Sequence, residues 1–290
     1  MVISNFGTFQ VEQLEDLDLI LLRKIFQTPF SVPKEAIYLE LGCQNLGTVI
    51  KSRRLTYLHY LIKQEDATML HKFFWTQWNF PAKRNEWTDQ VKKDLEEFQF
   101  SKDLETLKKI SISQFKTQVK KKAKEVAFFS LLEKKENHSK LENIFYSGLR
   151  MQNYLLELNK IDAQMVFSYR TRMANFRENY PNTGGPSVCP LCSSHCDRQK
   201  WSYQCPKIKE NVKIKGNYSN IFSDCITTET VQNLTQINKF RKEFLEERMV
   251  KNQNDCLATR PRCGCKPTDS HTCCRIQPNS NLNCNSDVIE

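Results

Sequence analysis

Apolar residues recur at the spacing of an α-helix in one segment after another of this chain. In the segment 111–132 they are Phe115, Val119, Ala123, Val126 and Phe129, which share one helix face because they recur every three or four residues. We also expect helices over 11–26, 33–42, 48–63, 69–78, 86–98, 144–158, 163–176 and 230–249. Only eight glycines and ten prolines occur among 290 residues, so few positions oppose helix formation. The sequence therefore predicts a mainly α fold.

Composition divides the chain into four predicted parts. Residues 1–180 carry most of the helical segments, and the proline- and glycine-containing stretch 180–186 marks a linker. A small cysteine-rich, zinc-knuckle-like element follows over 181–210, and then a basic linker with one further helix over 211–251. From 252 to 290, Asn, Ser, Pro, Thr and Cys dominate, which predicts a disordered tail. We thus expect a multi-helix domain, a cysteine-rich element, one more helix and a tail.

Positive charge is concentrated in the middle and at the end of the chain. The formal net charge of +10 is made up of −1 over residues 1–100, +7 over 101–180 and +4 over 181–290. Such a balance indicates attraction to polyanions, nucleic acid first among them. The residues expected at phosphates are Lys116, Lys120, Lys121, Lys122, Lys124, Arg170, Arg172 and Arg177. A merely solvated lysine-rich surface is the alternative interpretation.

Three cysteines have the spacing of metal ligands. Cys189 and Cys192 form a Cys-x-x-Cys pair, and Cys205 follows thirteen residues after Cys192. A tight turn brings the two thiolates of such a pair to about 3.5–4 Å from each other, which is one edge of a zinc–sulfur tetrahedron. The fourth ligand would be His195, Cys196 or a residue from elsewhere. The alternative is that these are structural thiols without a metal.

The remaining sequence limits the location of the chain. The first ten residues do not resemble a signal peptide, and no apolar run approaches about 18 residues, so we expect no membrane span. An intracellular location, nucleus or cytoplasm, is therefore expected, where cysteines bind metal or remain free. The seven Cys and His residues of the tail lack a regular ligand spacing.

Four stretches resemble one known family. They are LEDLDLILLRKIFQTPFSVPKEAIYLELG at 14–42, IKSRRLTYLHYLIKQ at 50–64, HSK at 138–140, and FSYRTRM at 167–173 before CPLC. In this order and spacing, about two thirds of the chain resembles the C-terminal, post-polymerase region of jockey-like non-LTR retrotransposon reverse transcriptases. The resemblance implies a helical region that ends in a zinc knuckle, which helps to hold template RNA or target DNA.

The sequence departs from that family at two points. A reverse transcriptase needs paired aspartates for two metal ions, and no Asp-Asp pair occurs in the 290 residues. The family's knuckle places a histidine about eight residues after the second cysteine, where this chain has Trp201. Tryptophan does not ligate zinc, so the knuckle needs another fourth ligand.

These observations together predict a non-catalytic nucleic-acid-binding remnant of an RNA-directed DNA polymerase protein. Its partners would be RNA or DNA, with a reverse transcriptase core supplied in trans, and Zn²⁺ would be its cofactor. Trp201 and Tyr203 could stack on bases, or Trp201 could fill the core of the knuckle. The rival hypotheses are a helical scaffold protein and an inert fragment. No enzyme activity is expected, because no catalytic constellation stands out.

Overall fold

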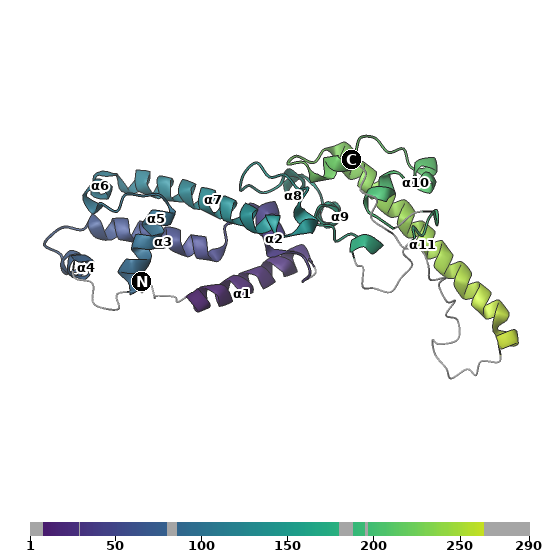
Figure 1. Ribbon diagram of the computed structural model, residues 1–290, viewed down its shortest axis with the longest axis horizontal. Coiled ribbons are helices and arrows are strands. Elements are labelled where there is room, and N and C mark those ends of the chain that lie inside the picture. The colour runs from purple at the N-terminus through teal and green to yellow at the C-terminus, as the bar shows by residue number, and fades with distance from the viewer. Residues whose placement is uncertain (1–7, 29, 80–85, 180–187, 195–196, 264–290) are drawn as a thin grey trace. The chain divides into compact units, whose positions relative to one another are not determined.

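The computed structural model describes residues 8–28, 30–79, 86–179, 188–194 and 197–263 (Figure 1). These residues form eleven α-helices and four short 3-10 helices, and they contain no β-strand. The prediction of a mainly α fold is confirmed. The chain divides into two compact units, Met1–Glu157 and Leu158–Glu290, each of which is described by itself below.

The first unit contains eight α-helices. They are α1 (Thr8–Phe26), α2 (Lys34–Leu41), α3 (Leu46–Ile62), α4 (Met69–Asn79), α5 (Glu86–Glu97), α6 (Leu104–Lys109), α7 (Ile112–Glu136) and α8 (Asn153–Glu157), with the 3-10 helix η1 (Ser139–Leu141) after α7. The six-residue helix α6 was not predicted, since it is too short to show a helical period.

Local sequence signals explain where several of these helices begin and end. The side chain of Asn45 accepts a backbone N–H of the first turn of α3 at 3.2 Å. Ser111 and Gln114 form a capping box at the start of α7, which stabilises the helix by satisfying two backbone donors. Gly42 ends α2 with φ 63°, and a Cβ there would lie 2.2 Å from the backbone of Arg150. Only glycine fits at this position.

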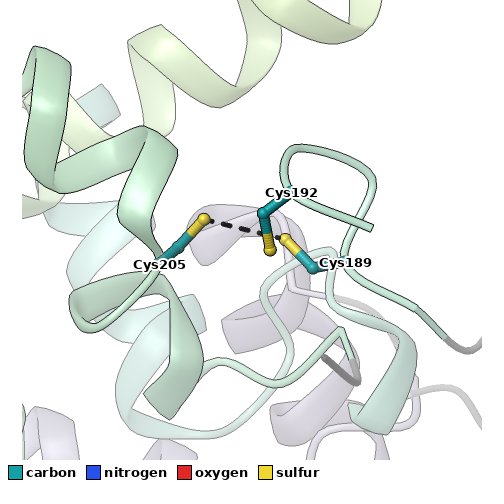
Figure 2. A group of neighbouring side chains, drawn as sticks. All are labelled: Cys189, Cys192 and Cys205. Carbon is teal, nitrogen blue, oxygen red and sulfur yellow. Dashed lines mark hydrogen bonds between the residues drawn. The ribbon is translucent and has the colours of Figure 1, made fainter. Parts of the chain in front are cut away.

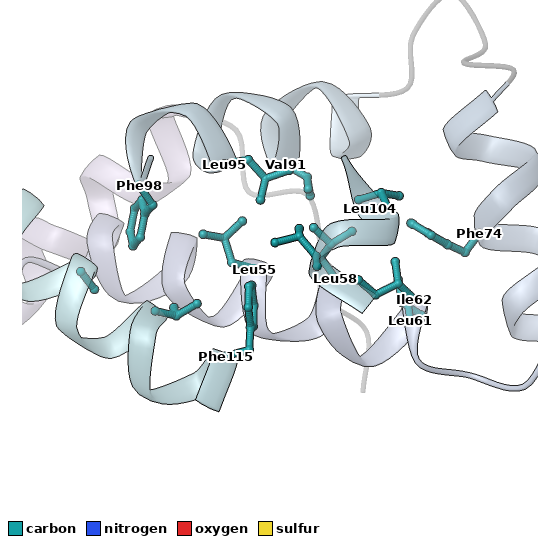
Figure 3. Close-up of a cluster of buried hydrophobic side chains, with 13 residues drawn as sticks. Leu55, Leu58, Leu61, Ile62, Phe74, Val91, Leu95, Phe98, Leu104 and Phe115 are labelled. Carbon is teal, nitrogen blue, oxygen red and sulfur yellow. The ribbon is translucent and has the colours of Figure 1, made fainter. Parts of the chain in front are cut away.

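The core of the first unit forms where α3, α5 and α7 meet. Figure 3 shows apolar side chains of these helices, among them Leu55, Val91 and Phe115, gathered into one cluster with Phe74 of α4. His59 of α3 is 1% exposed and stacks on Phe115, with ring centroids 4.3 Å apart. It is thus an ordinary core residue.

The buried stripe of α7 differs from its predicted face at one end. The buried residues are Phe115, Val119, Ala123, Ala127 and Leu131. Val126 is half-buried, and Phe129, which the sequence placed on the apolar face, is 67% exposed. Helix α7 packs against α3 and α2. Its buried residues follow the row of four-residue steps, which forms a ridge inclined to the helix axis, and Phe129 lies off this row.

The predicted helix over 144–158 is wrong except for α8. Glu40 is fully buried, and its two carboxylate oxygens accept the hydroxyls of Tyr146 at 2.7 Å and Tyr154 at 2.9 Å. In a helix these tyrosines would be about 12 Å apart along the axis, at 1.5 Å per residue. Both can reach one carboxylate only because most of the chain between them is not helical.

The second unit contains three α-helices and three 3-10 helices. They are α9 (Lys160–Arg170), η2 (Arg177–Asn179), η3 (Lys200–Tyr203), α10 (Pro206–Asn211), η4 (Tyr218–Phe222) and α11 (Thr228–Cys263). The boundary between the units lies at Glu157, whereas the sequence placed it at 180. The reason is that α9 packs against α11 and η4 and so belongs to the second core.

Two helices of the second unit have other limits than the sequence predicted. Helix α9 begins at Lys160, before the predicted start at 163, because the side chain of Asn159 caps it by accepting the N–H groups of Ile161 and Asp162 at 3.0 and 3.1 Å. The helix ends at Arg170, because Arg172 adopts a left-handed φ of 53°. Helix α11 continues to Cys263, beyond the predicted start of the tail at 252; residues 264–290 lie outside the described residues.

None of the helices within the described ranges is both long enough and apolar enough to cross a membrane.

Candidate functional site

The Cys-x-x-Cys pair lies on a turn that presents both thiols to the same side. The N–H of Ser193 donates to the carbonyl oxygen of Cys189 at 2.8 Å, and Ser193 has a left-handed φ of 55°. The backbone N–H groups of Leu191 and Cys192 act to lower the pKa of the Cys189 thiol, against the larger effect of burial. Such N–H donors stabilise a thiolate or a metal-bound sulfur.

Cys205 occupies the position directly before α10. Its own N–H donates to the carbonyl of Trp201 at 2.7 Å, which connects it to the 3-10 helix η3. The N–H groups of Lys207 and Ile208, at the start of α10, act to lower the pKa of the Cys205 thiol, against the larger effect of burial. At both Cys189 and Cys205, the N–H groups that favour the thiolate thus belong to the second and third residues after the cysteine.

The three sulfurs form a compact group that could hold a metal ion. Figure 2 shows the side chains of Cys189, Cys192 and Cys205 pointing toward one another, with the sulfurs of Cys189 and Cys205 4.0 Å apart. All three sulfurs lie within 4.8 Å of one another. Zinc–sulfur bonds of about 2.3 Å in a tetrahedron require about 3.8 Å between sulfurs, so small shifts would complete three corners. The predicted fourth ligands, His195 and Cys196, lie outside the described residues.

The thiols differ in acidity because their surroundings differ. Burial raises the pKa of Cys189, and burial with the nearby Cys189 thiol raises the pKa of Cys205 to about 12. Burial also acts to raise the pKa of Cys192, but hydrogen bonds from the N–H of Ser194, from the indole of Trp201 and from the other thiols lower it to about 7. Without a metal ion, Cys192 is therefore the thiol that ionises first.

The two aromatic residues predicted to stack on bases are partly or wholly enclosed. Trp201 is half-buried, and its indole acts to lower the pKa of the Cys192 thiol. Tyr203 is 8% exposed and makes an edge contact with Tyr218, with ring centroids 5.5 Å apart. The prediction that Tyr203 stacks on a base is wrong, since the residue is buried.

Helix α11 supports the cysteine site from outside its sequence neighbourhood. Arg241 forms a 2.8 Å ion pair with Asp197, and the two side chains are 10% and 11% exposed. The Arg241 guanidinium also lies 4.4 Å from the ring centroid of Phe176, and Arg248 donates to the carbonyl of Pro190 at 2.8 Å. Sequence reasoning missed these residues, because a lone arginine on a charged helix gives no sign that it is buried.

The predicted phosphate contacts of the second unit are not all accessible. Arg170 is fully buried, and its Nη1 donates to the carbonyls of Ile221 and Ser223 at 2.6 Å each. The prediction that Arg170 binds phosphate is therefore wrong; it connects α9 to η4. Arg172 is half-buried, and the side chain of Arg177 lies outside the described residues.

The predicted lysines of the first unit lie along α7. Lys116, Lys120, Lys121 and Lys124 are exposed, and none of the four forms an ion pair with another residue in the described ranges. Lys122 is half-buried, donates to Gln99 at 3.0 Å and lies 3.6 Å from Glu125. The four exposed lysines leave a row of unneutralised charge on one helix.

The predicted site residues are thus distributed over two units. Three predicted metal ligands come together in the second unit, and the lysine row lies in the first. Arg172 and Arg177 were also predicted to contact phosphate. Of these two, Arg172 has a partly accessible side chain, and the side chain of Arg177 is outside the described residues. No protein-family model, curated protein or solved structure matches this chain.

Proposed function

We propose that this chain is a non-catalytic nucleic-acid-binding protein. The observation that carries the proposal is the row of exposed lysines on α7, Lys116, Lys120, Lys121 and Lys124, which no described carboxylate neutralises. Unpaired ammonium groups along one helix match the regular negative charge of a phosphate backbone. Binding of this kind depends strongly on salt and little on base sequence.

The cysteine site has a structural role in this proposal. A zinc ion held by Cys189, Cys192 and Cys205 would connect the 188–194 turn to the start of α10. Their N–H donors and their spacing favour a metal that takes soft sulfur ligands. The ion would then stabilise the second unit, which carries Arg172 and further lysines.

The proposed origin is the post-polymerase region of a non-LTR retrotransposon reverse transcriptase, on the strength of the sequence blocks described above. In that setting, catalysis would belong to a polymerase core supplied in trans. The absence of an Asp-Asp pair from the sequence supports a binding role for this chain rather than a polymerising one.

A salt titration with a labelled single-stranded RNA tests the proposal. We expect the fluorescence anisotropy to report binding at low salt, with an affinity that falls linearly on a double-logarithmic plot. The variant Lys116→Ala/Lys120→Ala/Lys124→Ala should reduce the slope by about 2, at roughly 0.7 for each phosphate that is no longer neutralised. The same measurement on double-stranded DNA gives the preference between the two nucleic acids.

A matched variant separates the effect of the lysine row on RNA binding from the effect of total charge. Lys24, Lys72 and Lys93 are exposed and lie on the different helices α1, α4 and α5. Their replacement by alanine removes the same net charge and should leave the slope nearly unchanged. If both triple variants lower the slope equally, or if RNA does not bind at low salt, the proposed function is wrong.

A helical interaction protein is the second candidate. It is favoured by Leu17, Leu21 and Ile25 of α1, which recur every four residues and are 58%, 61% and 66% exposed. A protein of this class would form a complex through α1, and the alanine substitutions on α7 would not affect that complex. The RNA titration therefore distinguishes the two candidates.

A further inference from the structure

A cavity of about 540 Å³ lies in the second unit, beside the cysteine site. Its wall is formed by η3, by α10 and by the segment 212–218. Small-molecule sites in proteins fall mostly between about 300 and 1,000 Å³, so the volume suits a ligand of the size of a nucleotide. None of the residues predicted from the sequence to bind nucleic acid, apart from Tyr203, lines this cavity.

Three lysines give the cavity its charge. Lys200, Lys209 and Lys213 line it, and no carboxylate does. None of the three forms an ion pair within the part of the chain that the structure describes, whereas the neighbouring Lys207 pairs with Glu210 at 3.2 Å. Three unneutralised ammonium groups around one hollow favour an anionic ligand.

An aromatic ring of defined orientation lies in the same wall. Tyr218 is half-buried and makes edge contacts with Tyr203 and Phe222, with ring centroids 5.5 and 5.3 Å apart. Its hydroxyl accepts the side-chain N–H of Gln199 at 3.0 Å. A ring held in this way offers a stacking partner for a planar group at little entropic cost.

The segment that closes the cavity is held in place by α11. The N–H of Lys215 donates to the side-chain oxygen of Asn233 at 3.2 Å, and the amide of Asn233 donates to the carbonyl of Lys215. Gly216 adopts φ 76°, and a Cβ there would lie 3.1 Å from Asn220. The wall is thus formed before any ligand binds, as ligand pockets usually are.

We propose that this cavity binds a nucleoside phosphate, with the phosphate between the three lysines and the base against Tyr218. The ligand is either a free mononucleotide or one unstacked nucleotide of a single strand. In the strand-bound case the inference rests on the proposed function. In that case, the cavity is the part of the second unit that holds the strand.

Equilibrium dialysis of the full chain against labelled uridine monophosphate tests the proposal. We expect unlabelled uridine monophosphate to displace the label better than uridine or inorganic phosphate does, because each of these lacks one half of the ligand. The variant Lys209→Ala/Lys213→Ala should weaken retention roughly 25-fold, at about fivefold for each ammonium that contacts a phosphate in water. Tyr218→Leu should weaken binding of the nucleotide but not of phosphate.

The control is Lys239→Ala/Lys242→Ala, which removes the same charge from exposed positions of α11. Circular dichroism and zinc content of each variant report whether the second unit is intact. The proposal is overturned if nothing is retained, if both double variants retain the nucleotide equally, or if phosphate competes as well as the nucleotide does.

A single-stranded oligouridylate distinguishes the two ligand sources. If the strand displaces the mononucleotide and its own affinity falls in Lys209→Ala/Lys213→Ala, the cavity holds a nucleotide of the strand. If the strand does not compete, the free nucleotide is the ligand. Retention of the mononucleotide without any RNA binding would refute the proposed function and leave this inference standing, and RNA binding through α7 without any retention of the mononucleotide would do the reverse.

Discussion

Replacement of Arg241 by alanine should open the second unit around the cysteine site. Arg241 of α11 donates to Asp197 at 2.8 Å and to the carbonyl of Asn175 at 3.2 Å, and it lies over the ring of Phe176. Removal of one partner of a buried ion pair costs about 3–5 kcal/mol, since the other charge stays buried. Because both side chains keep about a tenth of their exposure, we expect the lower end, about 3 kcal/mol.

Alkylation of Cys205 measures this opening. Cys205 is fully buried, so in the presence of a chelator iodoacetamide reaches it only when the unit opens. A destabilisation of about 3 kcal/mol should raise the labelling rate by roughly 10²-fold, at about 1.4 kcal/mol for each factor of ten. The control is Lys242→Ala, an exposed neighbour that pairs with Glu246, which should change the rate by less than about threefold.

A double variant separates the effect of a buried charge from the effect of weaker packing. Asp197→Asn/Arg241→Gln removes both charges and keeps polar groups that can form a hydrogen bond. If the loss of the Arg241 charge beside the buried Asp197 carboxylate causes the opening, this variant should label much more slowly than Arg241→Ala. Equal labelling rates in the two variants would refute the electrostatic argument and would leave packing against Phe176 as the cause.

Three further outcomes follow from the described contacts. Arg170→Met should lower the free energy of unfolding by about 1–3 kcal/mol, because it leaves two buried carbonyls without their donor, but it should leave the salt slope of RNA binding unchanged. Zinc affinity should rise with pH, since binding releases thiol protons. The pKa of Cys192 is about 7 and that of Cys205 about 12, so one proton fewer is released above pH 7. A chelator competition should therefore show a steeper pH dependence of the zinc affinity below pH 7 than above it. Gly42→Ala should destabilise the first unit by more than about 1 kcal/mol in urea denaturation because of its left-handed φ, whereas Gly148→Ala, with nothing within 4 Å of its Cβ, should be neutral or slightly stabilising.

Helix type and approximate helix limits could be predicted wherever a segment carries its own period and its own cap. Ser111 before α7 and Gly42 after α2 are such local signals. The segment 144–158 was mistaken for a helix because two of its residues, Tyr146 and Tyr154, donate hydrogen bonds to the buried Glu40, which is distant in the sequence. A contact between residues more than a hundred positions apart in the sequence is not visible in a local period.

The candidate site was predictable in its cysteines and not in its surroundings. Spacing alone identified Cys189, Cys192 and Cys205, because a Cys-x-x-Cys turn has a narrow geometry. Arg170 and Arg241 show the limit of the same approach. One was predicted to bind phosphate and the other was overlooked, yet both are buried donors, and nothing in a single sequence distinguishes a buried arginine from an exposed one.

The position of Trp201 changes the interpretation of the cysteine site. In the family that the sequence resembles, a histidine ligand stands there; here the indole of Trp201 helps to lower the pKa of Cys192 to about 7. An indole does not ligate zinc, so Trp201 acts on the Cys192 thiol and is not itself a candidate ligand. Burial, by contrast, raises the pKa values of Cys189 and Cys205, so three thiolates cannot coexist here without a compensating positive charge. A divalent cation supplies that positive charge more directly than the lysines of the second unit do. Those lysines are exposed to solvent, whereas Cys189 and Cys205 are buried.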